Sequence, residues 1–323
     1  MPNIITHTIF CEEVLKKIEN QKYRQMIELH LEEYHIGTNG PDFFFFHGTF
    51  PFWKKNTSKI PMIGTMFHRE NINLFYETAI HAYLEQEAGI LKDAIGSYLI
   101  GHYLHWQLDS IMHPYVVYKT GFKEDMSTYY HHRFESMMDT ILLKHYRNTS
   151  IRHFKTYELC KRSKYSVDAI ATLYLPCIEK CQNKKLDKEI IQQALEDWEK
   201  AQRYLYDPHS VKYRLLKGIE KINHTPWLIS GNVVRPEVDE RYDVVNLAHH
   251  LWKHPCSGKE SFESVYDLMD KAIWDAQIGL SYLFEAMEGK GNTKLLSFID
   301  DKTYANGIKD KAERLYKDVI YEK

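Results

Sequence analysis

The stretch that decides the fold is Ala94–Pro114, AIGSYLIGHYLHWQLDSIMHP. If this stretch is helical, one of its faces carries residues spaced by three or four positions, namely Ile95, Tyr98, His102, His105, Asp109 and Met112. A helix face that packs into a core is normally apolar, yet this one contains two histidines and an aspartate. Burying a carboxylate beside imidazoles costs roughly several kcal/mol unless something pairs with them. A divalent metal ion would be a suitable partner, because imidazole and carboxylate are its usual ligands.

Composition sets wide bounds on the class of protein. A chain of 323 residues can bury a full core, and its 44% hydrophobic and 27% charged residues are ordinary for a globular protein. The net charge of -2 gives no basic footprint, so no stable nucleic-acid partner is expected. Histidine is the enriched residue, with 18 in all, and most of them precede residue 136.

The N-terminal sequence MPNIITHTIFCEEV has neither a basic region nor an apolar region of the kind found in signal peptides. No apolar run in the chain reaches the length needed to span a membrane. We therefore expect a cytoplasmic protein without a transmembrane segment.

Amphipathic helical periodicity covers most of the chain, while glycine, proline and alternating β-branched residues are sparse. The fold class is therefore predicted to be all-α. Pro114 is expected to end the helix that holds the opening stretch. We expect a long loop over 225–240 and helices over residues 8–18, 21–34, 70–87, 91–111, 128–146, 166–180, 188–205, 261–288 and 308–320.

Two pairs of candidate metal ligands have the spacing that brings side chains together on one helix face. His105 and Asp109 are separated by four residues, and His131 and Glu135 repeat this spacing on the next long helix. His113 follows Asp109 by another four residues. We expect the two helices, joined by a loop of roughly fifteen residues, to pack side by side and bring these groups together.

Three further candidates stand alone in the sequence. Asp42 lies between a polar loop and a run of phenylalanines, His68 ends the segment GTMFH, and His7 lies near the chain start. Taken singly, each of these residues would more often be a helix cap or a structural side chain.

The order of these motifs resembles the zinc-dependent phospholipase C family of bacterial helical enzymes. The matching segments in the first ~150 residues are THTIF with His7, GPD with Asp42, GTMFH with His68, GHYLHWQLDSIMHPY, and the HRFE segment with Glu135. The family spacing H-x3-E selects His131 rather than His132 as the partner of Glu135.

This resemblance implies a metal cluster. One zinc would be held by Asp42, His68, His105 and Asp109, and a second by His113, His131 and Glu135. Asp109 would also bridge towards a third metal near His7. In the secreted members, an N-terminal tryptophan completes the third site, and no tryptophan lies near the start of this chain. Two zinc ions are therefore expected, and the occupancy of the third site stays open.

The resemblance also implies a fold and an activity. The fold would be a multi-helix bundle of the phospholipase C and P1 nuclease type, with a metal-binding core over 1–160 and a helical C-terminal extension over 161–323 packed on it. The activity would be hydrolysis of a phospholipid or another phosphodiester, with Asp42 orienting or deprotonating the attacking water. The alternatives are a P1-type single-strand nuclease or nucleotidase, and a metal-stabilised binding protein without turnover.

The remaining histidines allow structural and functional interpretations. His102 is either a support for a neighbouring ligand or a core histidine, and His47 competes with His68 for a metal role. The cluster of His249, His250 and His254 either covers the metal site or belongs to an exposed surface.

Overall fold

The structure is a computed structural model that describes residues 4–49, 58–124, 126–309 and 312–322. Within these residues the fold is all-α, as predicted, with 63% of the structure helical and one small antiparallel pair of strands. The described α-helices are α1 (Ile4–Leu15), α2 (Gln21–Leu29), α3 (Leu31–Gly37), α4 (Pro61–Phe67), α5 (Ile72–Leu84), α6 (Ile90–Thr120), α7 (Ser127–Arg147), α8 (Ser166–Gln182), α9 (Lys188–Leu205), α10 (Val211–Ile222), α11 (Val265–Met287) and α12 (Thr293–Ile299). The strands are β1 (Trp252–Lys253) and β2 (Glu260–Ser261).

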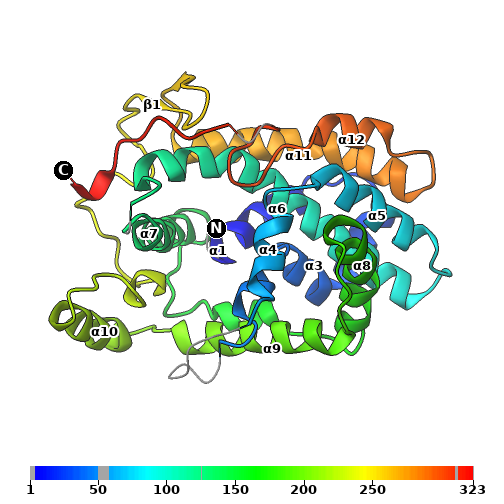
Figure 1. The fold of residues 1–323 in the computed structure, drawn as a ribbon, viewed down its shortest axis with the longest axis horizontal. Helices are drawn as coiled ribbons and strands as arrows, with labels where there is room; N and C mark the ends of the chain where they lie inside the picture. Colours follow the sequence, from blue (N-terminus) through cyan, green and yellow to red (C-terminus); the bar gives the residue numbers. More distant parts are fainter. Residues whose placement is uncertain (1–3, 50–57, 125, 310–311, 323) are drawn as a thin grey trace.

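Helix α6 is the centre of the fold. It is 31 residues long, and nearly every residue from Ala94 to Thr120 is buried. It packs against α3, α7, α8 and α11, and Figure 1 shows α11 running alongside it. The opening stretch of the sequence is thus covered on all sides rather than on one face.

The prediction that Pro114 ends this helix is wrong, because α6 continues to Thr120. Proline removes one helical hydrogen bond and costs about 3 kcal/mol in a helix interior. Burial of the apolar residues after it, Tyr115 to Val117, outweighs that cost. The connection to α7 therefore spans only residues 121–126 and is shorter than expected.

Close backbone packing between α3 and α6 positions the loop that carries Asp42. A Cβ atom on Gly37 would lie 2.4 Å from the Tyr98 carbonyl oxygen, and one on Gly101 would lie 2.5 Å from the Tyr34 carbonyl oxygen. Only glycine permits so close an approach at these positions. The chain after α3 consequently passes directly over α6, where the 3-10 helix η1 (Asp42–Phe46) begins.

Helix α1 is fixed to α7 through a buried carboxylate. The Thr6 backbone N–H and hydroxyl donate to Asp139 Oδ1 at 2.9 and 2.6 Å, and the Ile5 N–H donates to Asp139 Oδ2 at 3.4 Å. Free N–H groups at a helix start need such acceptors. The contact places His7, the next residue, against α6.

The structure differs from the predicted elements at three helices and near the C-terminus. Helices α4, α10 and α12 were not predicted, and α4 and α12 have only seven residues each, too few to show a helical period. The helix expected over 308–320 is wrong: in the described part of that range the backbone bonds to distant segments instead. Leu315 N–H donates to the Pro255 carbonyl at 2.7 Å, and Asp318 N–H to the Tyr118 carbonyl at 2.8 Å.

The division at residue 160 stays a prediction. Helices α8 and α9 pack on the elements that precede them, with α8 against α5 and α6, and α9 against η1. Among the described helices, none combines the length and the apolar character that crossing a membrane requires.

Candidate metal centre

All eight predicted ligands come together at the junction of α1, α6, α7 and the loop before η1. In the described part of the chain, histidine and carboxylate side chains form three groups that could hold a metal ion, with ligand atoms within 4.8 Å of one another. The groups are Asp42 with His68 and His105, His7 with His105 and Asp109, and His113 with His131 and Glu135.

Helix α6 supplies the middle of this cluster from three successive turns. His105 Nε2 lies 3.4 Å from Asp109 Oδ2, and His113 Nδ1 lies 3.6 Å from the same oxygen. The four-residue spacing brings these side chains to one face of the helix, as the sequence predicts. Asp109 is fully buried between the two histidines.

The first group joins α6 to the start of η1 and the end of α4. Asp42 Oδ1 lies 3.1 Å from His68 Nε2 and 3.6 Å from His105 Nε2. Gly40 lies directly beneath the His105 ring, and its φ of +48° is one that a glycine adopts without strain. The Gly-Pro-Asp segment therefore brings a carboxylate to α6 at very close range.

The second group joins α6 to α7. Glu135 Oε1 lies 2.8 Å from His131 Nε2 and 3.5 Å from His113 Nε2. His132, the neighbouring residue, belongs to none of the three groups. The structure thus brings together the same pair that the H-x3-E spacing selects.

His7 reaches the cluster from α1. Its Nε2 lies 3.1 Å from Asp109 Oδ1, and its ring lies 4.2 Å from the His105 ring, centroid to centroid. The structure therefore groups Asp109 with His7 and His105, whereas the family pattern places Asp109 with Asp42 and His68 as well. The two Asp109 oxygens face different partners, which is the arrangement that a bridging carboxylate needs.

Backbone carbonyls fix which ring nitrogen faces the cluster in three of the histidines. The Nδ1 atom of His68 donates to the Gly64 carbonyl at 2.7 Å, and that of His105 to the Thr38 carbonyl at 3.2 Å. A carbonyl can only accept, so Nδ1 carries the proton and Nε2 presents a lone pair. His113 Nδ1 likewise donates to the Tyr304 carbonyl at 3.1 Å. Histidines that bind metals are usually oriented in this way.

The arrangement of the ligand atoms suits a shared metal ion better than hydrogen bonds among the ligands themselves. Seven of them are buried and have no hydrogen-bond partner among the described residues, and they are His7 Nε2, Asp42 Oδ1, His68 Nε2, His105 Nε2, both Asp109 oxygens and His113 Nε2. Zinc lies about 2.1 Å from nitrogen and oxygen ligands, so tetrahedral ligands are about 3.4 Å apart. The separations of 3.1 to 3.6 Å between these atoms match that spacing. The residues present therefore fit zinc.

Burial and neighbouring charges set the protonation states. Burial lowers the pKa of His7 and of His131 to about 4, so both rings are neutral at pH 7. Burial alone would raise the pKa of Asp109 and of Asp42, but the adjacent histidines outweigh it and lower both, that of Asp42 to about 2. Burial would lower the pKa of His105, but Asp109 and Asp42 raise it. Ionised carboxylates and neutral imidazoles are the forms that bind zinc. His7 and His131 are already neutral, whereas His105, whose pKa is raised, releases its proton when it binds the ion.

Tyr304 is a site residue that sequence reasoning missed. Besides accepting from His113, its backbone N–H donates to the His68 carbonyl at 3.1 Å, and its ring lies 4.7 Å from the His68 ring. Tyr304 lies after α12, 191 residues after His113 and still further from His68, and a tyrosine in a loop carries no signal of such a role. Only the return of the chain to α6 creates the contact.

The other histidines lie outside the three groups. His102 stacks on Phe75 at 4.5 Å, and the Tyr76 hydroxyl lies 3.1 Å from its Nδ1. No hydrogen bond joins it to a predicted ligand in the described residues, so it is a core histidine. His47 contacts Ser58 at 2.8 Å, and His254 Nε2 donates to the Asn306 carbonyl at 2.8 Å, which helps to fix the turn that carries Tyr304.

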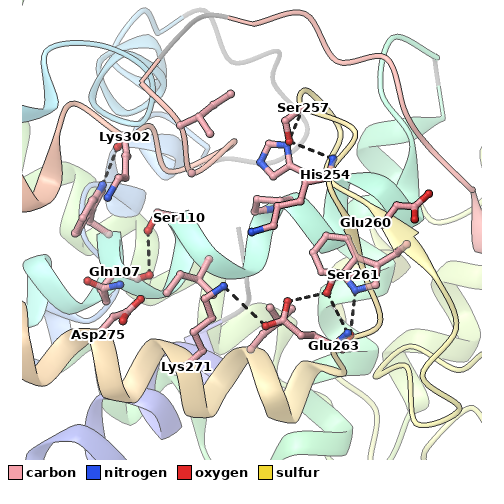
Figure 2. Close-up of a pocket in the computed structure, with 18 of the residues that line it drawn as sticks. Gln107, Ser110, His254, Ser257, Glu260, Ser261, Glu263, Lys271, Asp275 and Lys302 are labelled. Atoms are coloured by element: carbon pink, nitrogen blue, oxygen red, sulfur yellow. Dashed lines mark hydrogen bonds and ion pairs between the residues drawn. The ribbon is translucent and has the colours of Figure 1, made fainter.

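A pocket of about 440 Å³ lies on the opposite face of α6 (Figure 2). Gln107, Ser110 and Lys302 line it, together with acidic residues such as Glu263. On a helix, residues 107 and 110 point away from the face that carries 105, 109 and 113. This pocket is therefore separate from the metal centre.

Comparison with known families identifies the class of protein. Residues 6–190, more than half of the chain, match the sequence model of zinc-dependent phospholipase C. The chain therefore belongs to the zinc-dependent phospholipase C family. Comparisons with curated proteins and with solved structures gave no match.

Proposed function

We propose that this protein is a zinc-dependent phosphodiester hydrolase that acts on a phospholipid-type substrate. The observation that carries the proposal is the convergence of buried, unpartnered imidazole and carboxylate atoms on α6. Membership of the zinc-dependent phospholipase C family supports the reaction class.

We propose two zinc ions per chain. The His105 Nδ1 atom is bonded to the Thr38 carbonyl, so only its Nε2 can bind an ion, and it can serve only one of the two groups that share it. One ion would use Asp42, His68 and His105, and the other His113, His131 and Glu135. A third ion near His7 would then have only His7 and Asp109 as ligands among the described residues.

The cluster can activate water at neutral pH. Bound zinc lowers the pKa of a coordinated water and neutralises charge on phosphate oxygens. Asp42 remains ionised at neutral pH, since its pKa lies at about 2. A carboxylate with so low a pKa is a weak base, so Asp42 is better suited to orienting the attacking water than to accepting its proton. Asp109 links the His105 and His113 sides of the cluster and holds both rings in place.

The burial of the cluster indicates where substrate would approach and favours a second candidate function. The His131 side chain is 21% exposed, while those of His105 and Asp109 are fully buried. A phosphodiester would therefore reach the cluster from the His131 side. The same burial supports a metal-stabilised protein without turnover, in which zinc only holds α1, α6 and α7 together.

Hydrolysis assays on the zinc-loaded protein separate these functions. The substrates are p-nitrophenyl phosphorylcholine, phosphatidylcholine in mixed micelles, and single-stranded DNA. We expect turnover of the two choline substrates, and Asp109→Asn should reduce both this turnover and the zinc content. Asp207→Asn is the matched control, because Asp207 is also buried but caps α10. Bound zinc without turnover of any phosphodiester would favour the metal-stabilised alternative.

A further inference from the structure

Helix α10 is attached to the rest of the protein by a narrow contact. In Figure 1 it lies at a corner of the molecule, beyond the end of α9. Tyr213 and Glu220 are its buried residues, and it packs on η3, the 3-10 helix Ser230–Asn232. Most of the helix surface is therefore turned away from the core.

The outward face of α10 is apolar. Val211, Leu215, Ile219 and Ile222 are 65%, 65%, 48% and 79% exposed. At 3.6 residues per turn, these four side chains occupy an arc of about 80°. Leu228 and Ile229, in the loop that follows, are 41% and 44% exposed and extend the apolar surface. Soluble proteins rarely expose so many large apolar side chains together unless they bind something.

Basic side chains border this apolar arc on both sides. Arg214 and Lys221 follow one edge, and Lys212 lies at the other edge, where it also donates to the Tyr204 and Tyr206 carbonyls at 2.7 and 3.0 Å. Lys217 lies further round the helix, with its Nζ 5.9 Å from the Tyr213 ring. Glu220 is the only acidic residue in the helix, and it is turned inward. It accepts from the Ile229 and Ser230 N–H groups at 2.7 and 2.8 Å, so no carboxylate of α10 offsets the outward cations.

We propose that α10 binds the surface of an anionic phospholipid bilayer, lying in the plane of the membrane. An apolar arc pointing away from the protein, with cations on its flanks, is the pattern of a helix that inserts its apolar face at the boundary of the headgroups. The charge complements anionic lipid, and each lysine or arginine near such a surface strengthens binding about fivefold. A second protein surface would have to supply its own carboxylates to match these cations.

The membrane-facing helix is coupled to the metal centre through α7. The Ser136 hydroxyl on α7 donates to the Gly231 carbonyl of η3 at 2.6 Å, and a Cβ on Gly231 would lie 3.6 Å from the Arg133 nitrogen. The same helix carries His131 and Glu135. Helix α10 and η3 would thus connect the bilayer to the helix whose histidine is the most exposed ligand. The binding itself does not rest on the proposed hydrolysis.

Vesicle co-sedimentation of the full-length, zinc-loaded protein tests this inference. The probes are vesicles of phosphatidylcholine and phosphatidylglycerol at three to one, compared with vesicles of phosphatidylcholine alone. We expect much stronger binding to the anionic vesicles. Leu215→Ser with Ile219→Ser and Ile222→Ser should reduce that binding at least tenfold, and Arg214→Gln with Lys221→Gln about 25-fold. Trp274→Ser is the control, because Trp274 is 68% exposed but lies on α11.

Three results would overturn the inference. The first is equal binding to both kinds of vesicle, and the second is binding that neither set of α10 substitutions changes. The third is a dimer, measured by light scattering, that the serine substitutions dissociate, since the apolar face would then bind a second copy. Turnover of soluble p-nitrophenyl phosphorylcholine should be the same in all variants. Vesicle binding without any turnover would contradict the proposed hydrolase activity but would still support membrane binding by α10.

Discussion

Replacing Gly40 with alanine should weaken zinc binding without unfolding the protein. The added Cβ would lie 2.3 Å from Cδ2, 2.9 Å from Cγ and 3.0 Å from Nε2 of His105. Carbon atoms in contact lie about 3.5 Å apart, so the imidazole would have to move by about 1 Å. That movement would pull His105 away from the Thr38 carbonyl and from the two carboxylates it faces.

The size of the effect follows from this displacement. Disturbing the groups that orient a metal ligand typically costs 10- to 100-fold in affinity, about 1.4 to 2.7 kcal/mol, and Gly40→Ala should lie at the upper end because the ligand itself moves. The backbone adds about 1 to 2 kcal/mol of strain, since the φ of Gly40 is +48°. Competition with a chromogenic zinc chelator measures the affinity, and chemical denaturation measures the stability.

Gly289→Ala is the matched control for this experiment. Gly289 also has a positive φ, +76°, but a Cβ there would meet nothing within 4 Å. It should therefore show the backbone strain without the loss of zinc. If Gly40→Ala and Gly289→Ala bind zinc equally well, the placement of Gly40 beneath a metal-binding His105 is wrong.

Three further predictions concern the groups around the cluster. Tyr304→Ala should weaken zinc binding 10- to 100-fold and lower stability by about 3 to 5 kcal/mol, whereas Tyr304→Phe should keep the zinc affinity. Asp139→Ala should cost about 2 to 3 kcal/mol in chemical denaturation, because it leaves buried donors at the start of α1 unpaired, and a loss below 0.5 kcal/mol would contradict that role. The metal-free protein should lose about 5 kcal/mol between pH 6.5 and 4. Burial lowers the pKa of His7 and of His131 from 6.5 to about 4, so protons bind these two rings in the unfolded chain before they bind them in the folded protein, and each ring contributes about half of the loss. The raised pKa of His105 offsets little of it, because that ring is protonated in both states over most of this range, and equal stability of the chelated protein at pH 6.5 and pH 4 would contradict the prediction.

The local part of the metal centre could be predicted from the sequence. A four-residue spacing fixes the side-chain geometry on a helix whatever surrounds it, so the sequence alone predicts that His105 meets Asp109 and that His131 meets Glu135. Asp42 and His68 could be assigned to the metal centre only from the order of the family motifs, because no local sequence pattern shows that they lie near α6.

Long-range packing decided what the sequence could not predict. A proline normally ends a helix, so local sequence predicts a helix end at Pro114. Helix α6 continues beyond Pro114 because the residues that follow are buried. Residues 308–320 have a helical pattern, but in the described part of this range Leu315 and Asp318 donate to the carbonyls of Pro255 and Tyr118 instead. Tyr304 joins the cluster through its backbone and through the contact of its ring with His68, and no sequence pattern reveals either. The exposed apolar face of α10 could not be predicted either, because no helix is predicted over residues 211–222 and periodicity does not show which way an apolar face points.

The most direct test of the account is a crystal structure of the zinc-loaded protein, with anomalous scattering measured on both sides of the zinc absorption edge. The account predicts one zinc among Asp42, His68 and His105, and a second among His113, His131 and Glu135. Anomalous density at neither position, in crystals grown with excess zinc, would contradict it.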